Sequence, residues 1–160
     1  MRRALTLAER AARAGDVPVG ALVVSGSGEV LGEGWNLREA EGDPTAHAEV
    51  VAIRAAAARL GSWRLEGCSL VVTMEPCPMC AGAVVLSRVA RVVLGAWDPK
   101  LGACGSVWDV VRDRRATHRA EVVGGVLEEE CGEVVRRFFD GHRGPSVHDG
   151  ASGGTPGARS

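Results

Sequence analysis

Two short motifs contain the residues of this sequence that are best suited to bind a metal. They are H-A-E at residues 47–49 and P-C-P-M-C at residues 76–80. Cys77 and Cys80 are three residues apart, so on a helix their thiol groups point to the same side. Together with His47 they offer three ligands of the types that zinc prefers, which leaves the fourth tetrahedral position for water. The pattern therefore favours a catalytic zinc site formed by His47, Cys77 and Cys80.

Glu49 places a carboxylate close to this site in the sequence. Residues two apart do not share a helix face, so Glu49 and His47 are not expected to bind the metal in the same way. Bound zinc lowers the pKa of its water to about 7. We expect Glu49 to be the general acid–base residue beside that water, since both residues lie in the first turn of a predicted helix.

The cysteine pair could also be a redox pair or half of a structural zinc site. A redox C-x-x-C pair would leave the H-x-E motif without a role. Half of a structural zinc site would need two further ligands, and the candidates form no second pair with suitable spacing: Cys68, Cys104, Cys131 and His118. His47 or Glu49 alone would indicate little, and their combination with the two cysteines makes the catalytic site the preferred interpretation.

The composition is that of one globular domain. The chain has 160 residues, a net charge of −1 and 24% charged residues, so charge alone does not predict nucleic-acid binding. The five cysteines and the absence of a secretory signal argue against a disulfide framework and indicate the cytoplasm. No segment approaches the roughly 20 apolar residues that cross a membrane. We therefore expect a cytoplasmic protein without membrane contact.

Hydrophobic periodicity predicts alternating helices and strands. The first helix ends near Gly15, and a polar loop is expected over residues 37–43. Further helices are predicted over residues 44–60, 77–87, 106–111 and 127–139, and strands over residues 17–24, 30–36, 69–73, 91–96 and 120–123. This alternation predicts a three-layer α/β/α domain with a mixed central sheet of about five strands. We assign residues 1–143 to this domain, and predict that residues 144–160 form a disordered tail.

The pattern H-x-E … P-C-x-x-C resembles the zinc-dependent nucleobase and nucleoside deaminases. Over roughly residues 2–143, the chain is most similar to the bacterial tRNA-specific adenosine deaminases. The similarity lies in V-P-V-G-A at 17–21, G-E-G-W-N at 32–36, D-P-T-A-H-A-E at 43–49, T-M-E-P-C at 73–77 and G-A-C-G-S at 102–106. The resemblance implies a cytidine-deaminase-like fold, a homodimer and one Zn²⁺ per subunit.

The resemblance also implies a reaction and a set of contacts. A zinc-bound hydroxide, with Glu49 as proton shuttle, would convert the wobble adenosine of a tRNA anticodon stem-loop to inosine. Asn36 would hydrogen-bond the base edge, and the backbone N–H of Ala48 would hold the exocyclic position. Asp98 would contact the ribose of a neighbouring nucleotide, while Phe138 and Phe139 would pack near the anticodon. Asn36 and Asp98 have an alternative interpretation, in which they only close turns.

Two departures from the family pattern concern tRNA contacts. Trp97 stands where the family more often has Arg, and the residues after Phe139 are less basic than usual. A cluster at residues 112–119 contains Arg112, Arg114, Arg115, His118 and Arg119, which either contacts phosphates or is a solvated loop. Two other functions stay open: a deaminase for a free base or nucleoside such as guanine or cytosine, and a non-enzymatic zinc-binding interaction module.

Overall fold

Five strands form one mixed sheet in the computed structural model, which describes residues 1–142. The strands are β1 (Gly20–Val24), β2 (Val30–Trp35), β3 (Ser69–Met74), β4 (Arg91–Ala96) and β5 (Glu121–Val123). The helices are α1 (Arg2–Arg13), α2 (Arg38–Glu41), α3 (Ala48–Leu60), α4 (Pro78–Leu86) and α5 (Glu128–His142). The sheet order is β2-β1-β3-β4-β5, with β1 antiparallel to both neighbours and β3, β4 and β5 parallel.

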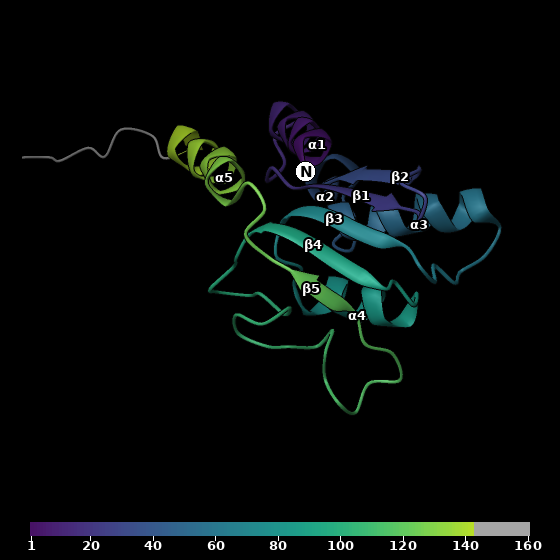
Figure 1. Cartoon of the computed structure of the whole chain (residues 1–160). Helices are drawn as coiled ribbons and strands as arrows, with labels where there is room; N and C mark the ends of the chain where they lie inside the picture. The colour runs from purple at the N-terminus through teal and green to yellow at the C-terminus, as the bar shows by residue number, and fades with distance from the viewer. Residues whose placement is uncertain (143–160) are drawn as a thin grey trace, which may run out of the picture.

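Helices cover both faces of this sheet (Figure 1). On one face, Ala4 and Leu7 of α1 pack against Leu22 of β1, and α5 lies beside α1. On the other face, α3 and α4 bury a larger core that includes Ile53 and Val84. The structure therefore confirms the predicted three-layer α/β/α domain with a mixed sheet of five strands.

Glycines in β2 let α3 approach the sheet closely. A Cβ atom on Gly34 would lie 2.2 Å from the carbonyl oxygen of Ala48, and one on Gly32 would lie 2.4 Å from that of Ala52. Because neither glycine carries a side chain, the first turn of α3 rests directly on β2. This close contact determines how far His47 and Glu49, at the start of α3, lie from the sheet.

Several boundaries differ from the sequence predictions because of side-chain contacts. The helix predicted from residue 44 begins at Ala48, since the carboxylate of Asp43 accepts hydrogen bonds from the N–H and hydroxyl of Thr45 and closes a local turn. The first strand begins at Gly20 and not at residue 17. The predicted loop over residues 37–43 contains the short helix α2, whose amide groups donate to the buried carboxylate of Asp16.

The predicted helix over residues 106–111 does not form. This segment consists of turns, and Cys104 pairs with Asp109 in an isolated β-bridge. The amide groups of Val107 and Trp108 donate to the carbonyl of Gly102, which holds the chain in a tight loop instead. Local sequence periodicity is misleading here because backbone contacts with residues 102–105 determine the conformation.

The last helix extends to His142, beyond the predicted end at Phe139. The predicted domain boundary at residue 143 and the predicted disordered tail lie outside the described residues. Within residues 1–142, none of the helices has the length and apolar character required to span a membrane.

Candidate active site

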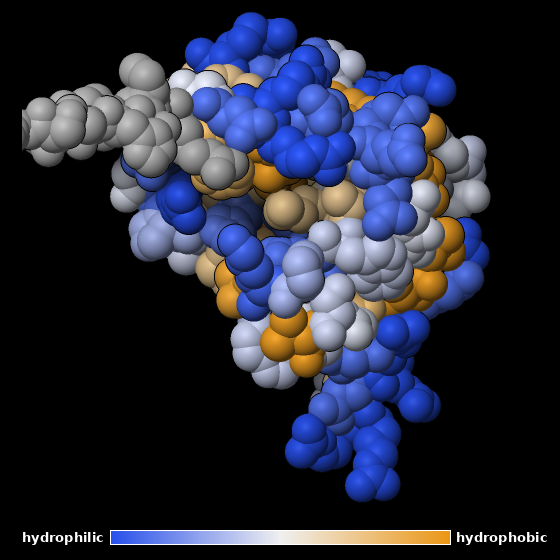
Figure 2. Space-filling view, turned by 90° about the vertical axis from the view of Figure 1, so that its left-hand side faces the viewer, coloured by the Kyte–Doolittle hydropathy of each residue, from blue (hydrophilic) through white to orange (hydrophobic). Residues whose placement is uncertain are grey.

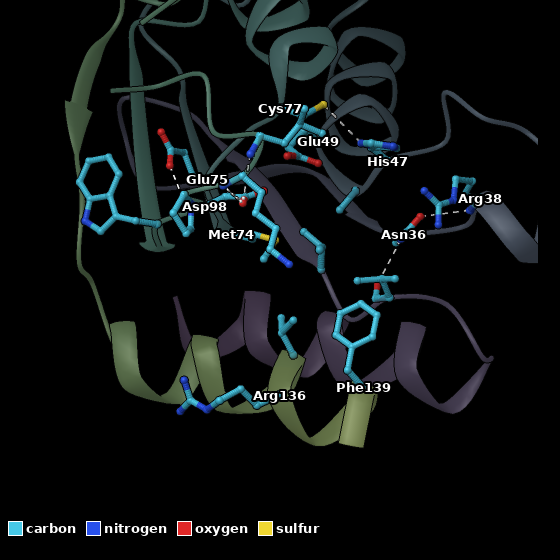
Figure 3. Close-up of a pocket in the computed structure, with 18 residues that line it drawn as sticks. Asn36, Arg38, His47, Glu49, Met74, Glu75, Cys77, Asp98, Arg136 and Phe139 are labelled. Atoms are coloured by element: carbon cyan, nitrogen blue, oxygen red, sulfur yellow. Dashed lines mark hydrogen bonds between the residues drawn. The ribbon is translucent and has the colours of Figure 1, made fainter. Parts of the chain in front are cut away.

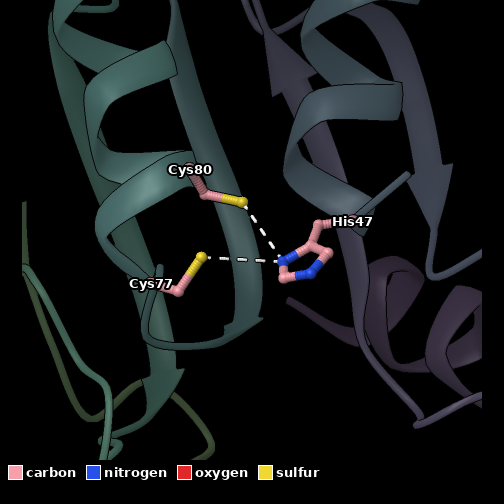
Figure 4. Close-up of side chains that lie close together, drawn as sticks. All are labelled: His47, Cys77 and Cys80. Carbon is pink, nitrogen blue, oxygen red and sulfur yellow. Dashed lines mark hydrogen bonds between the residues drawn. The ribbon is translucent and has the colours of Figure 1, made fainter. Parts of the chain in front are cut away.

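The three predicted metal ligands come together at the amino-terminal ends of α3 and α4 (Figure 4). His47 is the N-cap residue of α3, and Cys77 is the N-cap residue of α4 with Pro78 at the first helical position. Proline is favoured there because its fixed φ suits a helix start. The Nδ1 atom of His47 lies 3.6 Å from Sγ of Cys77 and 3.5 Å from Sγ of Cys80.

This geometry suits a tetrahedral zinc ion. Zn–N and Zn–S bonds of about 2.0–2.3 Å place the ligand atoms of a tetrahedral site about 3.6 Å apart, which agrees with the distances between His47 and the two thiols. All three ligand atoms lie within 4.8 Å of one another. Among the described residues, no second group of three or more such side chains is this close together. Within residues 1–142 this group has three members and no fourth side chain of these types, so it lacks the fourth protein ligand of a structural zinc site.

The two thiols have opposite acid–base properties. The pKa of Cys77 is lowered to about 4, chiefly by a hydrogen bond from the Cys80 thiol and also by one from His47. The hydrogen bond to Cys77 and burial raise the pKa of Cys80. Cys77 also contacts His47 in a way that raises the pKa of the imidazole. Metal binding would displace the proton of Cys80, because zinc binds thiolates.

Glu49 lies in the first turn of α3 and is almost completely buried, with 3% of its surface exposed. Burial raises the pKa of its carboxyl to about 7. Figure 3 shows Glu49 between Cys77 and His47 at the end of the cavity. A carboxyl group with such a pKa can both accept and donate a proton near neutral pH, which is the property that general acid–base chemistry requires.

A cavity of about 700 Å³ opens above these residues. Figure 2 shows the hollowed face, and Figure 3 shows labelled residues around the cavity. Its wall includes most of the predicted site residues, while Cys80 and Phe138 do not line it. The lining residues from the prediction are Asn36, His47, Ala48, Glu49, Cys77, Asp98 and Phe139.

Asn36 and Asp98 line the cavity and also close turns. The side-chain amide of Asn36 donates to the carbonyl of Val17 at 3.2 Å, while its Oδ1 accepts from the N–H of Arg38 at 3.1 Å. Oδ1 of Asp98 accepts from the N–H groups of Lys100 and Leu101 at 2.9 and 3.2 Å. The turn-closing role is thus observed for both residues, and their predicted substrate contacts stay predictions.

The two phenylalanines of α5 differ in position. Phe139 lines the cavity and is 46% exposed. Phe138 is half-buried and packs against Phe139 edge to face, with its ring centroid 4.2 Å from that of His142. Of the two, Phe139 is therefore the one placed to contact a molecule in the cavity.

Sequence reasoning missed several residues at the cavity. Arg38, Lys100 and Arg136 add positive charge to its wall, from three separate segments. Glu75 is buried beside the metal-binding segment and accepts hydrogen bonds from the loop that follows β4. In the sequence, Glu75 could have been noticed only because it directly precedes the P-C-x-x-C motif.

Trp97 lines the cavity as well, next to Asp98. The Trp97 ring packs over Gly124, where a Cβ atom would lie 2.1 Å from Cζ2. The basic cluster at residues 112–119 forms a loop that leads into β5, and its base is held by hydrogen bonds from His118 to Val89 and from Arg88 to Thr117. These contacts place residues 117–119 at the opposite end of the strands from Cys77 and Asp98. Arg112 differs from them, because its guanidinium donates to the carbonyl of Cys104 at 3.3 Å, in the loop that follows β4.

Comparisons with known proteins agree with this geometry. Residues 1–96 match the cytidine and deoxycytidylate deaminase zinc-binding region. The tRNA-specific adenosine deaminase of Bacillus subtilis (strain 168) is 52% identical over 139 residues, which are 87% of this chain and 86% of that protein. The tRNA-specific adenosine deaminase of Haemophilus influenzae is 47% identical over 143 residues, or 89% of this chain and 83% of that protein.

A solved structure is also similar. It comes from a study of A-to-I editing by tRNA:A34 deaminases at the wobble position of transfer RNA. The TM-score is 0.81 at 40% sequence identity, and the match covers 84% of this chain and 96% of that chain. The chain therefore belongs to the cytidine and deoxycytidylate deaminase family and is a zinc-dependent hydrolytic enzyme. The predicted family, zinc cofactor and enzyme class are confirmed.

Proposed function

We propose that this enzyme deaminates the wobble adenosine of a tRNA anticodon to inosine. The observation that supports this most directly is the identity of 47–52% with two tRNA-specific adenosine deaminases, over most of the chain. The cavity is consistent with such a substrate, because its volume of about 700 Å³ is lined both by Glu49 and by the exposed ring of Phe139. A loop nucleotide can leave its stack at modest cost, so an anticodon base can enter.

Glu49 is the proposed proton carrier in this reaction. Zinc held by His47, Cys77 and Cys80 would supply a Lewis acid that lowers the pKa of water toward 7. Glu49 takes a proton from the attacking water and delivers it to the adenine ring nitrogen, and then carries a second proton to the leaving amine. Its raised pKa, about 7, suits both transfers.

The cavity mouth supplies the proposed contacts to RNA. Asn36 and the N–H of Ala48 orient the base, while Asp98 contacts the ribose of a neighbouring nucleotide. Phe139 is exposed at the mouth and offers a ring on which a base can stack. Arg38 and Lys100 line the cavity from two separate segments and are placed to contact phosphates.

We further propose that two copies associate through α4. This nine-residue helix contains no charged side chain, and it exposes Met79 at 37% and Leu86 at 71%. An apolar helix of this kind is normally buried on all sides, so a second copy of the chain is the proposed cover. Light scattering of the wild type and of a Leu86→Glu variant tests this: a dimer that becomes a monomer supports it, and a monomeric wild type contradicts it. The cytoplasmic location stays a prediction.

The substrate is tested with the zinc-loaded protein and a panel of candidates. The panel contains an anticodon stem-loop with adenosine at the wobble position, the same stem-loop with guanosine there, and free guanine, cytosine and adenosine. Inosine formation in the adenosine stem-loop alone supports the proposal. Turnover of a free base with an unchanged stem-loop would select the alternative free-base deaminase, and no turnover with bound zinc would favour the interaction module.

A further inference from the structure

Glu75 has no assigned part in the reaction, yet its buried carboxylate connects two parts of the site. The residue is 3% exposed and lies two positions before the metal ligand Cys77. Its oxygens accept hydrogen bonds from the amide groups of Asp98, Cys104 and Ser106, at 2.8, 3.0 and 3.0 Å. The hydroxyl of Ser106 donates a further bond to the same carboxylate. Both oxygens of Glu75 are therefore committed to one loop.

This loop, residues 98–106, forms one rim of the cavity. It contributes Asp98, Lys100 and Leu101 to the cavity wall. Loop and metal-binding segment are also joined by the backbone, since the N–H of Ala103 donates to the carbonyl of Pro76 at 2.8 Å. A displacement of the Glu75 carboxylate would remove the side-chain hydrogen bonds to the rim and leave this backbone bond in place.

The loop packs tightly against the carboxylate of Glu75 at Gly102. A Cβ atom on Gly102 would lie 2.1 Å from Oε2 of Glu75 and 2.6 Å from the carbonyl oxygen of Asp98. The loop thus closes onto the carboxylate because residue 102 carries no side chain. Hydrogen bonds to a charged acceptor in such a buried place are stronger than those between neutral groups.

We propose that Glu75 is a positioning residue, which holds the 98–106 rim at a fixed distance from the metal-binding segment so that Asp98 and Lys100 meet the substrate pre-oriented. The role rests on the proposed function, because the substrate is taken to be an anticodon stem-loop. Glu75 does not contact the reacting atoms in this role. Its loss weakens substrate binding, and the chemical step proceeds as before.

The test uses Glu75→Gln in the full-length, zinc-loaded protein, with Glu121→Gln as a matched control on the exposed surface of β5. An amide side chain offers one acceptor oxygen where the carboxylate offers two, and its NH₂ group faces backbone donors. We expect a KM for the stem-loop that rises on the order of tenfold, since hydrogen bonds to a charged group contribute enough for such a change. The turnover number per bound zinc stays within about twofold. The control variant leaves both constants unchanged.

A second measurement does not depend on the substrate. Hydrogen exchange of the amides of residues 98–106 accelerates on the order of tenfold in Glu75→Gln, because their acceptor is weakened. Unchanged exchange, or a turnover number per zinc that falls while KM stays constant, overturns the proposal. If the wild type does not act on the stem-loop, the proposed function fails, and the exchange measurement still decides the role of Glu75.

Two further variants apply if Glu75→Gln does not fold. Ser106→Ala removes only the hydroxyl bond, so we expect a smaller rise in both KM and exchange, about threefold. Gly102→Ala pushes the loop away from an intact carboxylate and should also raise KM, with zinc content unchanged. Normal KM values in both variants contradict the positioning role.

Discussion

The floor and the mouth of the cavity are built in different ways. The floor consists of His47, Glu49 and Cys77, which come from two helix starts and are buried or half-buried. The third predicted metal ligand, Cys80, is buried next to them in the first turn of α4. The mouth consists of side chains from separated segments, several of them exposed: Arg38, Asp98, Lys100, Arg136 and Phe139. This difference indicates that the chemistry needs two helix starts brought together, while recognition depends on side chains from a larger number of separate segments.

The largest effect is expected from the proton carrier at the floor. Glu49→Gln keeps the shape of the side chain but removes its ability to accept a proton, so the turnover number should fall by about 10²–10⁴-fold. Zinc content should stay at the wild-type value, because Glu49 is not a ligand in the proposed site. Inosine formation and bound zinc are measured together, with Glu66→Gln as an exposed control. Activity within tenfold of wild type would remove Glu49 from its role.

The second prediction compares the reactivity of the Cys77 thiol at the cavity with that of the buried Cys104 thiol. In protein freed of zinc by a chelator, Cys77 with a pKa of about 4 is a thiolate at pH 6, whereas burial raises the pKa of Cys104 to about 12 and keeps it protonated. We expect iodoacetamide to modify Cys77 more than about 100-fold faster than Cys104, even though a low pKa reduces nucleophilicity. Mass spectrometry of timed samples measures both rates. Zinc should protect Cys77, and equal rates would contradict the assigned pKa values.

The third prediction concerns the close contact between Gly34 of β2 and the first turn of α3, which carries Glu49. Gly34→Ala places a Cβ atom against the Ala48 carbonyl and the Ala52 amide of α3. The helix must shift, which should lower the free energy of unfolding by about 1–3 kcal/mol and weaken zinc binding. In contrast, Gly141→Ala has nothing within 4 Å of the added atom and should change stability by less than about 1 kcal/mol. Urea unfolding of both variants provides the comparison, and equal stability would contradict the close approach.

At the mouth, we expect smaller effects that appear in KM. Phe139→Ala removes the exposed ring at the cavity and should raise KM for the stem-loop roughly tenfold, the magnitude of one base–aromatic stack. The turnover number should change little. Trp63→Ala is the control, since this tryptophan is 57% exposed and does not line the cavity. A reduced turnover number with constant KM would place Phe139 in the catalytic step instead.

The smallest effect is expected at the basic loop of residues 112–119. Residues 117–119 enter β5 at the opposite end of the strands from the mouth. Arg115 is paired with Asp113 at 2.7 Å. Replacing Arg114 and Arg115 by Ala should change tRNA affinity by less than about twofold, without altering its dependence on salt. If the slope of log affinity against log salt concentration became smaller by about two units, one for each arginine, the loop would be shown to contact phosphates. The phosphate hypothesis for this cluster stays a prediction until then.

The sequence alone determined the elements whose conformation depends on neighbouring residues. Pro76 and the cysteine spacing predicted a helix from about residue 77, one residue before α4 begins, and the alternation of elements predicted the three-layer sheet fold. The same logic failed for residues 44–47 and 106–111, where Asp43 and the carbonyl of Gly102 stabilise turns that periodicity does not reveal.

Only the tertiary structure decided how the separated segments meet. It placed Arg38 and Arg136 at one cavity, directed Phe139 but not Phe138 toward it, and buried Glu75 under the rim. The sequence could not reveal these positions, because each depends on contacts between residues that lie far apart along the chain. A helix start is a local arrangement of a few residues, whereas a buried carboxylate finds its partners only after the sheet has brought two loops together.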